Sequence, residues 1–221
     1  ILNNDANIDY IFPLDADEFI YCPSREKLNT FLTLIPQNRV GMYTWRGYLP
    51  HSTEYDPDFI SHFTDQRKEE ILTPKVIIPR AIAETCTLTI GSHSVRDKEG
   101  KEVQSIVFIG SNNQQFYYWF INRFNAEFIE TDDLWLGHYP IRSTIQQIKK
   151  VLEKSITMVM EKKGYRDSAW ENQLRDLLAH NLDISLDELR LIAYNYRASD
   201  EKQIQVARQQ PLCSTKFALK Y

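Results

Sequence analysis

The stretch that decides the fold is YIFPLDADEF at residues 10–19, where an apolar run leads directly into Asp15, Asp17 and Glu18. A short apolar run of this length predicts a buried strand. In open α/β sheets, ligands bind in the crevice outside the carboxyl ends of the strands. Three carboxylates there would repel one another without a cation, and Mg²⁺ is usually held by one or two carboxylates together with substrate phosphates. The stretch therefore predicts an α/β domain with a metal site for a phosphorylated substrate.

The same residues also allow a purely structural interpretation. Acidic residues after a strand often form only a turn or the start of a helix, and Pro23-Ser24 opens a predicted helix shortly afterwards. The apolar face of that helix would consist of Leu28, Phe31, Leu32 and Ile35. Spacing alone leaves both alternatives open.

Composition limits the classes of protein that the chain can represent. Its 221 residues, 43% hydrophobic and 25% charged, suit one large domain or a domain with an appendage. The net charge of −4, with no basic stripe between aromatic residues, argues against nucleic acid as a partner. No apolar run approaches the ~20 residues that a transmembrane helix needs.

The cysteines indicate a reducing compartment. Cys22, Cys86 and Cys213 are odd in number and widely separated, which argues against a disulfide framework or a structural zinc site. We therefore expect a cytoplasmic protein, either free or peripheral to the inner face of the membrane.

The periodicity of the chain divides it near residue 142. Residues 1–142 contain short runs of β-branched and aromatic residues that predict strands. These runs lie at 40–45, 75–78, 85–90, 103–109, 116–121 and 134–139. Residues 143–221 predict a helical appendage, with capping boxes that open helices at Ser143, Ser168 and Ser185. From Ser199 the tail predicts a weak helix followed by a loosely held end.

A second segment with chemical potential is LWLGHYPIRS at residues 134–143. A strand that ends in His138, followed by Arg142 and Ser143 at a helix N-terminus, gathers an imidazole, a guanidinium and free backbone N–H groups where anions bind readily. The alternative is a buried histidine with a satisfied hydrogen bond and a serine that only caps the helix.

The two segments together resemble a known family. LDADEF at 14–19 resembles the Asp-x-Asp signature of metal-dependent glycosyltransferases of the GT-A fold, in particular glycosyltransferase family 2 and its relatives. GHYPIRS at 137–143 is similar to the His-Tyr-x-x-Arg-Ser motif that accompanies it in one bacterial branch. The resemblance implies a partial GT-A (Rossmann-like) domain that moves a sugar from a nucleotide-sugar donor to a hydroxyl of a glycan or lipid-linked glycan acceptor, in bacterial surface polysaccharide synthesis.

Family members carry several βα units before the Asp-x-Asp motif, including those that hold the nucleotide base. Here the motif begins at Asp15. We therefore expect the chain to be a fragment that lacks its N-terminal nucleotide-binding units and binds nucleotide poorly on its own.

The resemblance also implies the ligands of a metal. Asp15 and Asp17, with His138, would hold Mn²⁺ or Mg²⁺ against the donor diphosphate. Glu18, Arg142 and Ser143 would bind substrate beside them.

Further residues are implied by the same branch, each with a structural alternative. Lys75 would meet phosphate or a sugar carboxylate, unless it is only a lysine at a strand edge. His93 would act as the general base or contact the acceptor, unless it lies in a surface loop. Trp45 would line the acceptor pocket, unless it packs in the core. Asp132 is the carboxylate assigned to deprotonating the acceptor, from the only later acidic cluster before His138.

Two rival functions stay open. A haloacid dehalogenase type phosphatase or phosphotransferase also places Asp-x-Asp after a strand, with a later acidic pair that Asp132 and Asp133 imitate, but Phe19 stands where that class has a small Thr or Val. A truncated domain that keeps the motif could also be inactive and serve only in binding. The chain lacks the Gln-x-x-Arg-Trp motif of processive synthases, which argues against long processive synthesis.

Overall fold

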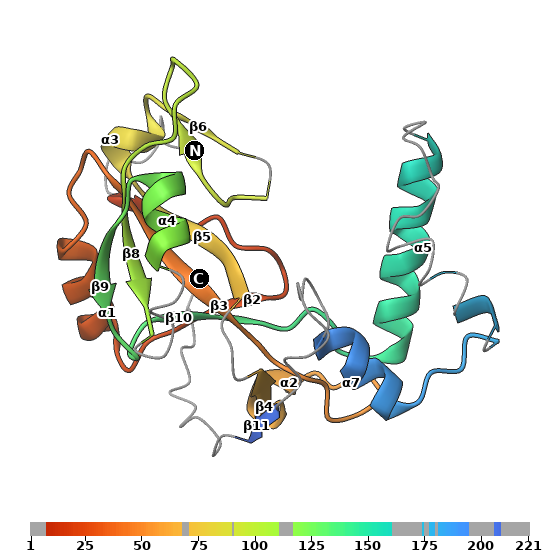
Figure 1. The fold of residues 1–221 in the computed structure, drawn as a ribbon. Coiled ribbons are helices and arrows are strands. Elements are labelled where there is room, and N and C mark those ends of the chain that lie inside the picture. The colour runs from red at the N-terminus through yellow and green to blue at the C-terminus, as the bar shows by residue number, and fades with distance from the viewer. Residues whose placement is uncertain are drawn as a thin grey trace. The chain divides into compact units, whose positions relative to one another are not determined.

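One mixed sheet flanked by helices organises the first half of the chain (Figure 1). The computed structural model describes residues 8–67, 71–89, 91–110, 117–160, 174, 177–179, 181–194 and 206–208. The chain divides into two compact units. The sheet unit comprises the described residues of 1–46 and 69–138, and the helical unit comprises those of 47–68 and 139–214.

The sheet has seven strands. Its main path runs in the order β1 (Tyr10–Ile11), β5 (Ile71–Pro79), β3 (Val40–Gly47), β10 (Trp135–His138) and β2 (Glu18–Tyr21). The pairs β1–β5, β5–β3 and β10–β2 are antiparallel. Off this path, β8 (Ser105–Ile109) pairs parallel with β3, and β9 (Glu127–Glu130) pairs parallel with β8. The fold is therefore α/β with a mixed sheet.

Alternating side chains of β3 build a core on each face of the sheet, because successive residues of a strand point to opposite sides. Tyr43 and Trp45 pack with Phe31 of α1 (Arg25–Thr33) in one cluster. Met42 packs in the other cluster with Ile82 of α3 (Arg80–Ala83) and with Phe124, the last residue of α4 (Tyr117–Phe124). With both faces covered, β3 is buried along almost its whole length.

Several predicted elements are confirmed. The runs at 40–45, 75–78, 103–109 and 134–139 fall on β3, β5, β8 and β10. Helix α1 begins where predicted, and the Ser24 hydroxyl accepts a hydrogen bond from the Lys27 backbone N–H at 3.0 Å as its N-cap.

Other predicted elements are wrong or shorter than expected. The run at 10–14 is not a buried strand: β1 ends at Ile11, Pro13 has no N–H for a ladder, and Leu14 is 38% exposed. The run at 116–121 is largely helical in α4, since a short aromatic run cannot be assigned to strand or helix from periodicity. The run at 85–90 contributes only β6 (Thr87–Leu88), which pairs with β7 (Val95–Arg96).

The helical unit has its own core. Helix α5 (Thr144–Met160) and helix α7 (Leu186–Tyr194) begin at the predicted capping serines. Apolar residues from both helices form one cluster with Leu49, which follows β3 along the chain, and with residues of the connecting loops. Its buried members include Leu49, Ile141, Val151, Leu177, Leu189 and Ala193. The helix predicted from Ser168 lies mostly outside the described residues, although residues 174 and 177–179 are helical.

Short elements complete the helical unit. Helix α2 (Phe59–His62) precedes β4 (Asp65–Arg67), which pairs antiparallel with β11 (Val206–Arg208). The weak helix predicted for the tail is therefore wrong at 206–208, where the backbone is a strand. None of the helices in the described part of the chain combines the length and apolarity that a membrane crossing requires.

Candidate active site

Residues from four strands and one turn of the sheet unit meet in a cluster of charged and aromatic side chains, here called the carboxylate–lysine cluster. It contains Glu18 at the start of β2, Lys75 of β5, Trp45 of β3 and His138 at the end of β10, with Asp15 in the turn before β2. All five are residues that the sequence motifs predict for a site. The structure brings them together from distant parts of the sequence. Asp15 and Lys75, for example, are 60 positions apart.

Strand register explains the convergence. Lys75 lies directly opposite Tyr43 in the β5–β3 ladder, and His138 lies opposite Glu18 in the β10–β2 ladder. The β5–β3 register shifts between Tyr43 and Trp45, and both side chains belong to the same core cluster. Directly opposed residues in antiparallel strands have Cβ atoms about 4.5–5.5 Å apart, close enough for their side chains to interact. The pairing of strands thus determines the cluster.

A fully buried lysine lies at the centre of the cluster. The Lys75 Nζ atom is 2.8 Å from Oδ2 of Asp15 and 3.3 Å from Oε2 of Glu18. The side chains of Lys75 and Glu18 are both 0% exposed, whereas that of Asp15 is 61% exposed. An isolated charge in such a place is costly, and buried charges are normally paired. The two carboxylates compensate the ammonium, and the contact holds the Asp15 turn against β5.

Glu18 has an unusual environment for a carboxyl group. Burial raises its pKa to about 7, although hydrogen bonds from the Asp15 backbone N–H and attraction to Lys75 act in the opposite direction. Its Oε2 atom accepts from the Asp15 N–H at 2.9 Å, while its buried Oε1 atom has no hydrogen-bond partner among the described residues. A carboxyl that titrates near neutral pH beside other functional groups is typical of functional sites.

Burial and the charge of Glu18 also raise the pKa of the Tyr43 hydroxyl well above its usual range. Tyr43 is 0% exposed and belongs to the core cluster on the α1 side of the sheet. Sequence analysis did not identify Tyr43, because an aromatic residue in a strand predicts only core packing. Its phenol keeps its proton at neutral pH and can only act there as a neutral hydrogen-bonding group.

The imidazole of His138 connects the acidic turn to the aromatic residues. Its Nε2 atom is 3.8 Å from Oδ2 of Asp17, and its ring stacks on Trp45 with centroids 4.2 Å apart. Trp45 also contacts the ring of His93 edge-on, at a centroid distance of 5.8 Å. Trp45 is only 3% exposed, so packing within the protein is its main role.

The loop before His93 fixes the orientation of that ring. Nδ1 of His93 is 2.9 Å from the carbonyl oxygen of Pro74. Because a carbonyl can only accept, Nδ1 carries a proton in this contact. Gly91 has a φ of +82°, and a Cβ there would lie 2.8 Å from His93 Nε2. The glycine therefore permits both the turn and the close approach of the imidazole.

The residues assigned to a metal are only partly assembled. Asp17 and His138 face each other, but the Oδ2 atom of Asp15 is bound by the Lys75 ammonium. Among the described residues, one group of three possible metal ligands has atoms that all lie within 4.8 Å of one another. It consists of His51, Asp56 and His62, in the helical unit. A metal at Asp15, Asp17 and His138 stays a prediction.

Asp132 has a different partner. Its Oδ1 atom accepts a hydrogen bond from Arg46 at 3.1 Å, and its side chain is 57% exposed. The Arg46 guanidinium also lies 4.3 Å from the centroid of the Trp135 ring. Asp132 thus binds the residue that follows Trp45 along β3.

Arg142 and Ser143 belong to the helical unit. The Ser143 hydroxyl accepts from the Gln146 backbone N–H at 3.2 Å, so the interpretation of Ser143 as a helix cap is confirmed. The Arg142 backbone N–H donates to Gln146 Oε1 at 2.9 Å, and its guanidinium lies 5.2 Å from the centroid of the Phe59 ring. Their participation in the same site as Asp17 stays a prediction.

None of the family models, curated proteins or solved structures compared with the chain matches it.

Proposed function

We propose that this protein is a metal-dependent glycosyltransferase with a GT-A type domain, and that the turn from Asp15 to Glu18 lies at its donor site. The observation that carries the proposal is the contact between the two segments on which the resemblance rests. Asp17 of LDADEF and His138 of GHYPIRS face each other at 3.8 Å, although 120 positions separate them. Neither composition nor local packing requires these two segments to meet.

The reaction class fits the charges of the cluster. During transfer, the bond between the sugar carbon and the diphosphate breaks, a bond to the acceptor oxygen forms, and the acceptor proton passes to a base. A Mn²⁺ or Mg²⁺ ion held by Asp17, with Asp15 and His138, would stabilise the negative charge that develops on the departing diphosphate. Lys75, between Asp15 and Glu18, holds the acidic turn in place.

His93 is the better candidate for the base. Its Nδ1–H donates to the carbonyl oxygen of Pro74, so Nε2 is the ring atom that would receive the acceptor proton. The carboxylate of Asp132 is already engaged by Arg46. Trp45 contacts both His93 and His138 and would position the two imidazoles.

The phosphatase alternative receives less support from the same contacts. It requires the later acidic pair near Asp15, yet Asp132 binds Arg46 and Asp133 binds Lys27. Both of these carboxylates are about half exposed.

Binding and turnover measurements test the proposal. The complete enzyme is titrated with Mn²⁺ and a panel of nucleotide sugars, and release of nucleoside diphosphate is then measured. Asp17→Asn should lower kcat by about a hundredfold or more, since stabilisation of developing charge is worth several kcal/mol. Glu99→Gln, which changes a carboxylate that is 73% exposed, is the matched control and should retain activity.

Two results would contradict the proposal. Normal turnover by Asp17→Asn, or turnover that is indifferent to a chelator, would exclude the metal role of the turn. Release of inorganic phosphate from phosphate monoesters, without transfer of sugar, would favour the phosphatase.

A further inference from the structure

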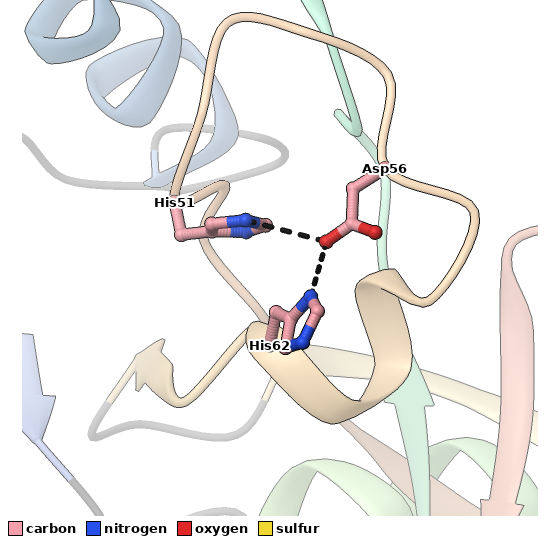
Figure 2. A group of neighbouring side chains, drawn as sticks. All are labelled: His51, Asp56 and His62. Carbon is pink, nitrogen blue, oxygen red and sulfur yellow. Dashed lines mark hydrogen bonds and ion pairs between the residues drawn. The ribbon is translucent and has the colours of Figure 1, made fainter.

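A second group of possible metal ligands lies in the helical unit and shares no residue with the carboxylate–lysine cluster. His51 and Asp56 lie in the segment between β3 and α2, and His62 is the last residue of α2. Figure 2 shows the two imidazoles approaching the same carboxylate of Asp56 from different sides. All three side chains come from one stretch of twelve residues, so that local chain geometry alone brings them together.

We propose that His51, Asp56 and His62 form a binding site for a transition-metal ion of the Zn²⁺ type. Their ligand atoms all lie within 4.8 Å of one another. The Oδ2 atom of Asp56 is 3.3 Å from Nε2 of His51 and 2.6 Å from Nδ1 of His62. Ligands about 2.0–2.2 Å from a tetrahedral Zn²⁺ lie roughly 3.3–3.5 Å from one another, so small side-chain rotations suffice to admit the ion.

The chemistry of the donors selects the class of metal. Two imidazole nitrogens and one carboxylate oxygen suit Zn²⁺ and its first-row neighbours, whereas Mg²⁺ and Ca²⁺ take oxygen ligands. Three protein ligands also leave one tetrahedral position for water or a substrate atom. The site differs in this respect from a closed structural zinc site.

Neighbouring groups hold the ligands in place. The second oxygen of Asp56, Oδ1, accepts from the Asp58 backbone N–H at 2.8 Å, which leaves Oδ2 directed at the imidazoles. Asp58 in turn accepts a hydrogen bond from the Ser61 hydroxyl at 2.9 Å, one residue before His62. The His51 ring packs edge-on against Phe63, which is 2% exposed. Such outer contacts orient metal ligands and are important for affinity.

The same geometry can also exist as an ion pair without metal. The hydrogen bond to Asp56 raises the pKa of His62, and the same bond lowers the pKa of Asp56. A metal would replace the shared proton, since coordinating histidines must be neutral. The two states use the same three side chains and differ in whether a metal binds, which a titration decides.

Access favours the site. The side chains of His51 and His62 are 39% and 55% exposed, and that of Asp56 is 15% exposed. An ion can therefore reach the ligands without opening of the core. The proposal is independent of the glycosyltransferase proposal, because the two sites have no residue in common.

Titration of the metal-stripped chain with Co²⁺ tests the proposal, with Zn²⁺ added afterwards as competitor. We expect one equivalent of Co²⁺ to give the visible absorption of a four-coordinate ion, and Zn²⁺ to displace it. His51→Gln, Asp56→Asn and His62→Gln should each weaken binding by about tenfold to a hundredfold or more, because each removes a direct ligand. Circular dichroism of the metal-free variants checks that they are folded.

Two controls separate this site from others. His93→Gln, which alters a histidine of the sheet unit, should leave Co²⁺ affinity unchanged. Asp17→Asn should also leave it unchanged, which distinguishes this site from the proposed donor site. X-ray absorption of the Zn²⁺-loaded chain should show nitrogen and oxygen neighbours with two imidazoles. Sulfur neighbours, or equal Co²⁺ affinity in wild type and the His51→Gln/His62→Gln double variant, would overturn the proposal.

Discussion

The carboxylate–lysine cluster and the His51–Asp56–His62 group are both small sets of opposite charges, but they are built in different ways. The first combines residues from position 15 to position 138 through strand pairing, and Lys75 and Glu18 at its centre are fully buried. The three residues of the second lie within one stretch of twelve, and its histidines are substantially exposed. The first therefore depends on the whole sheet, whereas the second depends on one loop and a short helix.

An ion pair therefore contributes differently to stability in the two environments. Removing one partner of a buried ion pair leaves an uncompensated charge in a region of low dielectric constant. Removing one partner of an exposed pair changes little, because water and salt already screen the charges. We therefore expect substitutions in the buried cluster to change stability, and substitutions in the exposed group to change mainly ligand binding.

Substitution of Lys75 should give the largest effect. Lys75→Met removes the ammonium that compensates Asp15 and Glu18 while it retains much of the apolar volume. At pH 8 we expect the free energy of unfolding to fall by about 3–5 kcal/mol, the usual range for breaking a buried pair. Urea unfolding followed by circular dichroism measures the change.

The matched control for this substitution is Lys101→Met. Lys101 pairs with Glu99 at 2.9 Å, but both side chains are more than 70% exposed. Its loss should change stability by less than about 0.5 kcal/mol. Equal effects of the two substitutions would remove the distinction between a buried and an exposed pair.

The pH dependence of stability should report on Glu18. Its pKa is about 7 in the folded chain against an ordinary 4.5, so the folded state binds the proton more tightly. Its contribution to stability is therefore complete below pH 4.5 and is lost as the pH rises through about 7. The shift corresponds to roughly 3 kcal/mol across this window.

Comparison with Glu18→Gln isolates this contribution, because glutamine keeps the shape and cannot titrate. The stability of wild type relative to the variant should decline between pH 4.5 and pH 7, when measured by urea unfolding at a series of pH values. Glu99→Gln should show the slope of the wild type. A wild-type slope in Glu18→Gln would mean that the pKa of Glu18 is the same in the folded and unfolded chain.

Local sequence patterns were sufficient to predict much of the sheet and several of the site residues. The strand runs around Tyr43 and Lys75 and the cap at Ser24 were predicted correctly, because short-range periodicity and capping chemistry determine them. Sequence motifs selected Asp17 and His138 separately. Their contact depends on the β10–β2 register, which no local pattern encodes.

The failures have physical causes as well. The aromatic run that begins α4 satisfies strand and helix patterns equally, and its assignment requires knowledge of what covers the sheet. The burial of Lys75 could not be predicted, since a lysine in a strand is ordinarily exposed unless partners such as Glu18 are supplied by other strands. The His51–Asp56–His62 group was missed although its ligands are local. The spacing His-x4-Asp-x5-His was the available signal.

The smallest effect on stability should come from His62. His62→Gln removes an imidazole that is 55% exposed and contacts Asp56 and the ring of His51 at the surface. In metal-free buffer we expect the Tm to change by less than about 2 °C, because exposed ion pairs contribute little to folding.

With excess Zn²⁺, the Tm of the wild type should rise, since a ligand that binds only the folded state stabilises it. The Tm of His62→Gln should stay near its metal-free value, as measured by calorimetry, while His93→Gln should respond to Zn²⁺ as the wild type does. A large loss of Tm in metal-free His62→Gln would show that the exposed group supports the fold, and the contrast with the buried cluster would then fail.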